Sequence, residues 1–585
     1  MKPIFLIIFA LCCLLPLRAQ NTTRSDSLMN RELILEKEYN PTIRDAVKIS
    51  QFPELREPKA SKSAVEFSNY TTPYDVRSKP VPLSPQAYLT DMNFSKYRGY
   101  LTGGISSLID IDGDLGYRIL DSDQDRLSAF LSHRSSACNV SYLQNVSYSQ
   151  ETGKQQFKIN DNWGGLNYMH DFGDIKFLAD AKYTYSAFNY YGLTVGTFNK
   201  SSNQVDRLLE ACLGISSERR GEFDYKINIG YTNFQQKYGG SIGESGSKEN
   251  RVLIDGDIRK MISSSMGVDL SGFIKTYSYS NRFRILNKST TNYWTFSLKP
   301  SIYWEDININ FLLGAKMEVE VGGRKKVVVS PAVRFNYYPS SWLLFYLLAD
   351  GGRKDNSLYN LFYENRYVDP LIRVMDSRSP LDATAGVKFT PLSTMNVDIF
   401  GGYTIMKDEH FFYPNMGTGS YFVDGVSMLS GNGMAPIYEN ANTLKLGTDI
   451  KYTFQDIYEL EIKGVYYHRM ISADRNRNYA IPRRAWNKPD FEINLNGYYR
   501  LPGLPLRFDL SYLGAYGRKA IDSSNSLRVI KMNDIHDLSG KVTYSFTPNF
   551  SVYVSSNNTL FSRYDLWWGY PAQGFNIMGG LSVLF

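Results

Sequence analysis

Few residues of this 585-residue chain have the spacing that a catalytic or metal site requires. None of the five histidines has the paired spacing of a metal site, and no nucleophile carries a local catalytic signature. Glycine pairs such as Gly103-Gly104 are not followed by the Lys-Ser/Thr ending of a phosphate loop. We therefore expect no enzyme activity, no cofactor and no metal. The histidines are His133, His170, His410, His468 and His536.

Aromatic side chains beside Asn and Arg are the other groups that could do chemistry, because such surfaces bind sugars, glycans or a protein partner. They gather in the segments 356–367, 410–415 and 565–570. The competing interpretation is an aromatic girdle at a membrane interface, and the sequence leaves both open. The candidate ligand or partner residues are Tyr359, Phe362, Tyr363, Arg366, Tyr367, Phe411, Phe412, Trp567 and Trp568.

The segments that would position these residues are strands with one apolar face. From about Arg98 onward apolar residues recur at every second position, as in the stretch 223–231, and again in 458–466, 491–499 and 506–512. This alternation predicts one face toward lipid and one toward water. The longest apolar run after the N-terminal leader, Trp342 to Ala349, has eight residues and is too short for a membrane helix. A membrane chain of this kind must close into a barrel.

The connections between these strands alternate in length. Tight turns occur, for example, at 172–174 and 455–456, whereas the long stretches are 238–250, 353–380, 410–442 and 474–490. Short periplasmic turns and long extracellular loops are typical of outer-membrane barrels. We predict an all-β, antiparallel transmembrane barrel over residues 98–585, with about 22 strands and a range of 18–24.

The C-terminal residues predict the closing strand of this barrel. Apolar residues fall at alternating positions up to the terminal aromatic residue, as in a strand with one lipid-facing side. We interpret them as the signal read by the outer-membrane barrel assembly machinery. These residues are Phe575, Ile577, Leu581, Val583 and Phe585.

The N-terminal residues 1–19 predict a signal peptide, with a short cationic start, an apolar run from Ile4 to Leu17 and a small residue at Ala19. Lipidation at Cys12 or Cys13 is not expected.

Without Lys2 and Arg18 the 65 basic residues become 63 against 58 acidic ones, a balance that does not suggest nucleic-acid binding. Two cysteines remain, Cys138 and Cys212, and the sequence does not tell whether they pair.

Residues 20–97 form a Pro-rich segment, which we call the arm. Its stretch from Leu35 to Ala46 resembles a segment near the start of receptor-like barrels of Bacteroidota. With the strand number, signal peptide and terminal Phe585, the chain resembles the barrel of TonB-dependent receptors. The resemblance implies ligand capture and transport across the outer membrane, with outer-membrane lipids and either TonB or a surface lipoprotein as partners.

The arm is shorter than the plug domain that precedes such barrels, and no TonB box can be placed in it. One hypothesis is that the arm fills the lumen; the other is that it binds a periplasmic partner while inward loops close the pore. The function has a matching alternative, a non-transporting barrel subunit of an outer-membrane assembly, secretion or surface-lipoprotein complex. The arm residues expected to make polar contacts are Arg31, Glu32, Glu36, Lys37, Arg44 and Asp45.

Overall fold

The computed structural model places most of the chain after residue 96. The described residues are 97–143, 154–192, 203–217, 223–239, 245–280, 292–322, 326–370, 372, 374–414, 422–423, 426–427, 433–472, 482–522 and 528–585. The predicted signal peptide and nearly all of the arm, including Arg31, Glu32, Glu36, Lys37, Arg44 and Asp45, lie outside them.

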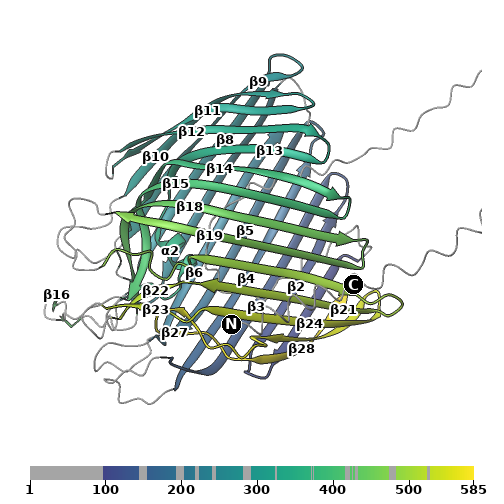
Figure 1. Ribbon diagram of the computed structural model, residues 1–585, viewed down its shortest axis with the longest axis vertical. Coiled ribbons are helices and arrows are strands. Elements are labelled where there is room, and N and C mark those ends of the chain that lie inside the picture. The colour runs from purple at the N-terminus through teal and green to yellow at the C-terminus, as the bar shows by residue number, and fades with distance from the viewer. Residues whose placement is uncertain are drawn as a thin grey trace, which may run out of the picture. The chain divides into compact units, whose positions relative to one another are not determined.

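A single antiparallel sheet of 22 strands closes on itself (Figure 1). Closure occurs because β1 (Gly99–Ser106) pairs on one side with β2 (Ile111–Asp121) and on the other with β28 (Asn576–Leu584). A closed sheet leaves no unpaired edge, which is the condition for strands to cross a bilayer. The predicted fold class and strand number are confirmed.

The other strands of the barrel follow in chain order, and each pairs with its neighbours in the ring. They are β3 (Asp125–Ser141), β4 (Lys154–Asp171), β5 (Ile175–Asn189), β6 (Asn203–Ser217), β7 (Phe223–Gln236), β8 (Lys248–Met261), β9 (Met266–Ser280), β10 (Tyr293–Glu305), β11 (Ile309–Val321), β12 (Val327–Ser340), β13 (Leu343–Lys354), β14 (Ser377–Leu392), β15 (Met395–Pro414), β18 (Met434–Phe454), β19 (Tyr458–Ser472), β20 (Phe491–Arg500), β21 (Leu506–Tyr516), β24 (Ile535–Thr547) and β25 (Phe550–Asn557).

The alternation in the sequence corresponds to the two faces of the wall. On β7, Phe223, Ile227 and Ile229 are exposed on the outer face, whereas Asp224 and Asn228 alternate with them. Exposed apolar side chains on the outside of a closed sheet are what a lipid-facing wall requires. The polar side chains then line the lumen.

The two ends of the barrel differ. At one end, which we call the short-turn end, strands are joined by turns such as 172–174, where Gly173 has a φ of +88° and its N–H donates to the Asp171 carboxylate. The backbones of Gly99 and Phe585 pair at this end, with N···O distances of 2.7 and 2.9 Å. At the other, long-loop end the connections are longer.

The long connections contain the remaining secondary structure. The helix is α2 (Leu358–Glu364), and the small hairpins pair β16 (Phe422–Val423) with β17 (Val426–Ser427), β22 (Lys519–Asp522) with β23 (Arg528–Lys531), and β26 (Asp565–Trp567) with β27 (Tyr570–Pro571). In the part of the chain that the structure describes, no helix has the length and apolarity to cross a membrane.

The predicted C-terminal signal residues lie at the seam of the barrel. Ile577 and Leu581 are exposed on the outer face of β28, and Phe585 is exposed at its end, stacked on Tyr117. Phe575 differs from the prediction, because it precedes the strand and stacks instead on Phe561 with ring centroids 4.6 Å apart. Away from the seam, Cys138 and Cys212 are both free.

Candidate functional site

The connection from β13 to β14, residues 355–376, folds inward, and we call it the cap. Its helix α2 begins because the Ser357 hydroxyl accepts a hydrogen bond from the Asn360 N–H at 3.2 Å. Leu358, Leu361 and Phe362 then fall on one face at helical spacing, and they are 0, 0 and 4% exposed. Short as it is, the helix is held by burial rather than by its own propensity.

The apolar face of the cap packs against the inner wall from several directions. Phe234 of β7 stacks on Phe362 with ring centroids 5.6 Å apart, and Phe188 of β5 meets Tyr367 edge-on at 6.1 Å. Phe412 of β15 and Met434 of β18 belong to the same buried cluster. Because β4 to β7 stand opposite β15 and β18 in the ring order, the cap crosses the lumen at the long-loop end (Figure 1).

Two further connections join the cap in this cluster. From the β25–β28 connection, Tyr570 stacks on Tyr367 with centroids 4.0 Å apart, and Trp567 meets Phe412 edge-on at 5.2 Å. From the β5–β6 connection, the Tyr190 hydroxyl donates to the Val368 carbonyl at 2.9 Å. Loops that are distant in sequence therefore form one apolar core inside the barrel.

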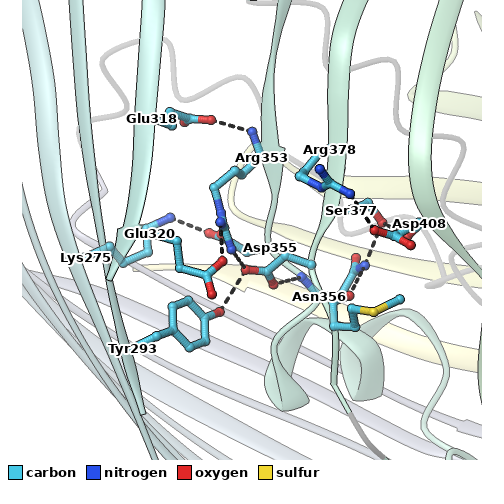
Figure 2. A network of polar contacts seen from close by, with 12 residues as sticks. Lys275, Tyr293, Glu318, Glu320, Arg353, Asp355, Asn356, Ser377, Arg378 and Asp408 are labelled. Carbon is cyan, nitrogen blue, oxygen red and sulfur yellow. Dashed lines mark hydrogen bonds and ion pairs between the residues drawn. The ribbon is translucent and has the colours of Figure 1, made fainter. Parts of the chain in front are cut away.

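Ionic groups fix both roots of the cap to the wall, and we call them the root cluster. Asp355, at the entry, pairs with Lys275 of β9, and Asp376, at the exit, pairs with Arg353 of β13. Arg353 also pairs with Glu320 of β11 (Figure 2). The side chains of Arg353, Glu320 and Asp376 are 3–7% exposed, so each charge depends on its partners.

Hydrogen bonds from uncharged donors tie the two roots to each other. The Tyr293 hydroxyl donates to Asp376 at 3.0 Å, and the Asn356 N–H donates to the other carboxylate oxygen of Asp376 at 3.1 Å. The Asn356 amide donates at 2.7 Å to the Ser377 hydroxyl, which donates at 2.7 Å to the Asp408 carbonyl. Figure 2 shows these side chains converging from neighbouring strands beside α2.

The two root carboxylates titrate in opposite directions. Burial favours the neutral form of Asp355, but the Lys275 ammonium, together with Tyr277 and Arg353, lowers the pKa of this carboxyl. For Asp376, burial and the nearby Asp355 charge raise the pKa against the opposing effect of Arg353. Asp355 is therefore the firmly ionised member of the pair.

The tip of the cap is held by a second set of polar contacts between ionisable side chains, the tip contacts. Glu364 binds His410 of β15 at 2.7 Å and Lys488 of the β19–β20 connection at 2.6 Å. Arg366 binds Asp161 of β4 at 2.9 Å. Burial alone would raise the pKa of the Glu364 carboxyl, but Lys488 and then His410 hold it well below its usual range.

The structure brings most of the predicted aromatic residues together but buries them. Phe362, Tyr367, Phe411, Phe412 and Trp567 are buried. The rings of these five form buried clusters at the long-loop end, so they offer no exposed aromatic surface in this structure, and their role as ligand or partner residues stays a prediction. Of the others, Tyr363 is 59% exposed, and Tyr359, Arg366 and Trp568 are partly exposed.

Phe411 lies in a separate buried cluster with Trp486 and Ile521, and not in the core of the cap. The ionic residues of the root cluster were missed, because Lys275, Glu320 and Arg353 come from three strands with no common motif. A local signal for α2 was present, since Ser357 precedes an apolar i, i+3, i+4 pattern.

Comparison with known proteins finds similarity in structure only. No protein-family model matches the chain, and no curated protein matches it. The FrpB iron transporter of Neisseria meningitidis is similar at a TM-score of 0.62 and 9% identity, over 84% of this chain and 81% of that one.

Two further structures show the same likeness. The siderophore receptor PirA of Acinetobacter baumannii has a TM-score of 0.60 and 11% identity, covering 84% of this chain and 80% of its own. The ferripyoverdine receptor of the outer membrane of Pseudomonas aeruginosa has a TM-score of 0.58 and 11% identity, covering 84% and 72%. At such identities the likeness shows a shared fold, that of outer-membrane receptor and transporter barrels.

Proposed function

We propose that this protein is an outer-membrane receptor that captures a ligand at its long-loop end and transports it through a lumen closed at rest by the cap. The observation that carries the proposal is the cap itself, packed across the inside of a closed 22-stranded barrel. A barrel of this size encloses a lumen wide enough to leak solutes unless something fills it.

The similar structures support transport as the purpose of the barrel. Their names give an iron transporter, a siderophore receptor and a ferripyoverdine receptor, so ferric siderophores are the first ligands to test. The long loops then face the cell exterior, where the exposed Tyr363 and the partly exposed Tyr359, Arg366 and Trp568 are the candidate contacts.

Energy coupling and the arm are the finer parts of this proposal. Opening a cap with a buried apolar core requires work, which suits coupling to TonB or to a ligand-bound partner. The arm, residues 20–97, would lie on the periplasmic side and either enter the lumen from below or dock the energy-coupling partner. Arg31, Glu32, Glu36, Lys37, Arg44 and Asp45 are the charged groups for those contacts.

Single-channel conductance in planar bilayers tests which segment closes the pore. We expect the full chain to show a small conductance, and deletion of residues 21–90 to leave it small because the cap remains. A large conductance after this deletion would show that the arm, and not the cap, is the main closure. Ferric siderophores added to the long-loop side should bind the full chain, and absence of binding for every class would count against the receptor function.

The complete burial of the residues at the centre of the cap favours a second candidate, a barrel subunit that does not transport. Leu358, Leu361 and Val368 are all 0% exposed, as in a permanent protein core. In such a complex the assembly machinery, a secretion component or a surface lipoprotein would dock on the barrel.

Gentle solubilisation of the membranes followed by affinity purification separates the two candidates. A stoichiometric partner protein and a conductance that no ligand changes would support the subunit. An isolated barrel that binds a small ligand would support the receptor.

A further inference from the structure

The rim of the barrel at the long-loop end is low around the seam. There β1 and β25 have 8 residues each and β28 has 9, whereas β15 and β18, elsewhere in the ring, have 20 and 21. A tilted strand needs about 9–11 residues to cross the hydrocarbon layer. The seam strands therefore end near the level at which the hydrocarbon ends, while β15 and β18 continue beyond it.

Large apolar side chains are exposed along this low rim. Ile109, in the β1–β2 connection, is 66% exposed, and Phe561, in the β25–β28 connection, is 68% exposed. Leu560, Ile105 and Ile577 are exposed beside them in sequence or at the adjoining strand ends. We call Ile105, Ile109, Leu560, Phe561 and Ile577 the low-rim patch.

The backbone at both tips is unusual for water-exposed turns. Ile109 has a φ of +60° and Phe561 a φ of +52°, a left-handed conformation that Gly, Asn and Asp adopt most readily. A branched residue at such a position is a rare outlier. The backbone strain is the same in any solvent, but the exposed apolar side chains are unfavourable in water, so these residues fit an apolar surrounding better.

Hydrogen bonds hold the two connections together, so the patch is a built surface. Asp110 accepts from the Asn576 amide at 2.8 Å, and the Ser107 N–H donates to the Ile577 carbonyl at 2.8 Å. On the other connection, the Asn558 side chain accepts from the Ser562 N–H at 2.8 Å. Each exposed apolar tip therefore has a fixed position.

The patch continues the lipid-facing wall upward at the ends of β1 and β28, and Ser107 is the exposed polar residue between Ile105 and Ile109. Ile105 lies on the same outer face of β1 as Leu101, and Ile577 on the same face of β28 as Leu581, and all four are exposed. By contrast, the β7–β8 connection begins with the exposed Lys237.

We infer that the low-rim patch is immersed in the outer leaflet of the membrane, with lipid acyl chains as its partner. The inference rests on the proposed placement of the barrel in the outer membrane. It adds that the seam side of the long-loop end lies at the lipid surface, whereas the ends of β15 and β18 stand in water.

A fluorophore that senses lipid tests this in the full chain. NBD is attached to Ile109→Cys in a background with Cys138→Ala and Cys212→Ser, and the protein is reconstituted in phosphatidylcholine nanodiscs with or without doxyl-labelled lipid. Leu581→Cys is the control for the lipid-facing wall and Lys237→Cys the control for water. We expect the label at position 109 to be quenched by doxyl lipid several-fold more than the label at 237 and to resist aqueous iodide.

The controls separate the possible failures. If the label at 581 is in lipid but the label at 109 behaves like that at 237, the inference is overturned and the barrel placement stands. If position 109 is aqueous in nanodiscs but shielded in native membranes, a partner protein covers the patch, which also overturns it. If the label at 581 is aqueous, the membrane barrel itself is wrong. If Ile109→Cys does not fold, the same quenching measurement with NBD on Phe561→Cys tests the inference.

Discussion

The two ends of the barrel are built by different physical means. At the short-turn end the connections are short and bond within themselves or to the adjacent strand, as where Gly173 and Asp171 complete the turn between β4 and β5. At the long-loop end the cap depends on β9, β11, β15 and β4, which supply the partners of its roots and its tip. Local chemistry therefore shapes one end, and contacts between distant segments shape the other.

This difference assigns the two ends different roles. A turn that carries its own hydrogen bonds can only join two strands. A connection whose residues are buried against the opposite wall closes a passage, and it can move only by breaking those contacts. Changes at the long-loop end should thus alter the pore, whereas matched changes at the short-turn end should alter little.

Removing the cap should have the largest effect. Replacing residues 357–374 by a short Gly/Ser linker leaves Asp355 and Asp376 in place and takes away the apolar core of the cap. Because a 22-stranded lumen is wide, we expect single-channel conductance to rise many-fold.

The matched change at the other end is to replace residues 455–457, between β18 and β19, by Gly/Ser, which should leave the conductance unchanged. An equally small conductance in the cap variant would place the closure outside the cap and remove the contrast between the ends.

The wall and its turns were predictable because their signals are local. The alternation at Phe223, Ile227 and Ile229 needs only the period of a strand, and a turn such as 172–174 is marked by its own glycine. The cap was not predictable in the same way. Whether Phe362 faces water or Phe234 depends on a strand more than a hundred residues away, and Tyr363 beside it has the opposite environment.

That contrast within α2 supplies the second prediction. Phe362→Ala removes a buried ring and should cost about 3–5 kcal/mol of cap stability, whereas Tyr363→Ala, at an exposed position, should change it by less than about 0.5 kcal/mol. Hydrogen exchange of the Leu361 and Asn365 amides, which bond to Ser357 and Leu361, reports the opening of the cap. Equal exchange in both variants would mean that α2 is not docked.

Breaking an ion pair should cost more stability at the long-loop end than at the short-turn end. Glu364→Gln removes the charge that holds His410 and Lys488 at the tip, and should cost about 2–3 kcal/mol because that site is buried. Glu459→Gln breaks the pair with Lys451 near the short-turn end, where side chains are more exposed, and should cost less than about 1 kcal/mol. Amide exchange in α2 and thermal unfolding measure the two costs; similar values would contradict the difference between the ends.

Acid should have the smallest effect on the cap, because its carboxylates respond in opposite directions. The pKa of Glu364 is held below its ordinary value of 4.5, so its stabilisation is present above that value and is lost as pH falls through the lowered pKa. The raised pKa of Asp376 acts the other way, since its protonation as pH falls favours the folded cap.

Exchange in α2, corrected for its intrinsic pH dependence, should therefore quicken as pH falls through the lowered pKa of Glu364, in acid below the ordinary value of 4.5. In Glu364→Gln the exchange rate of the α2 amides should no longer rise in acid. At neutral pH the rate should be higher than in the unaltered protein by a constant factor. An acid limb of the same size in Glu364→Gln would show that Glu364 is not the carboxylate that fixes the tip. The long-loop end would then be held mainly by its apolar core.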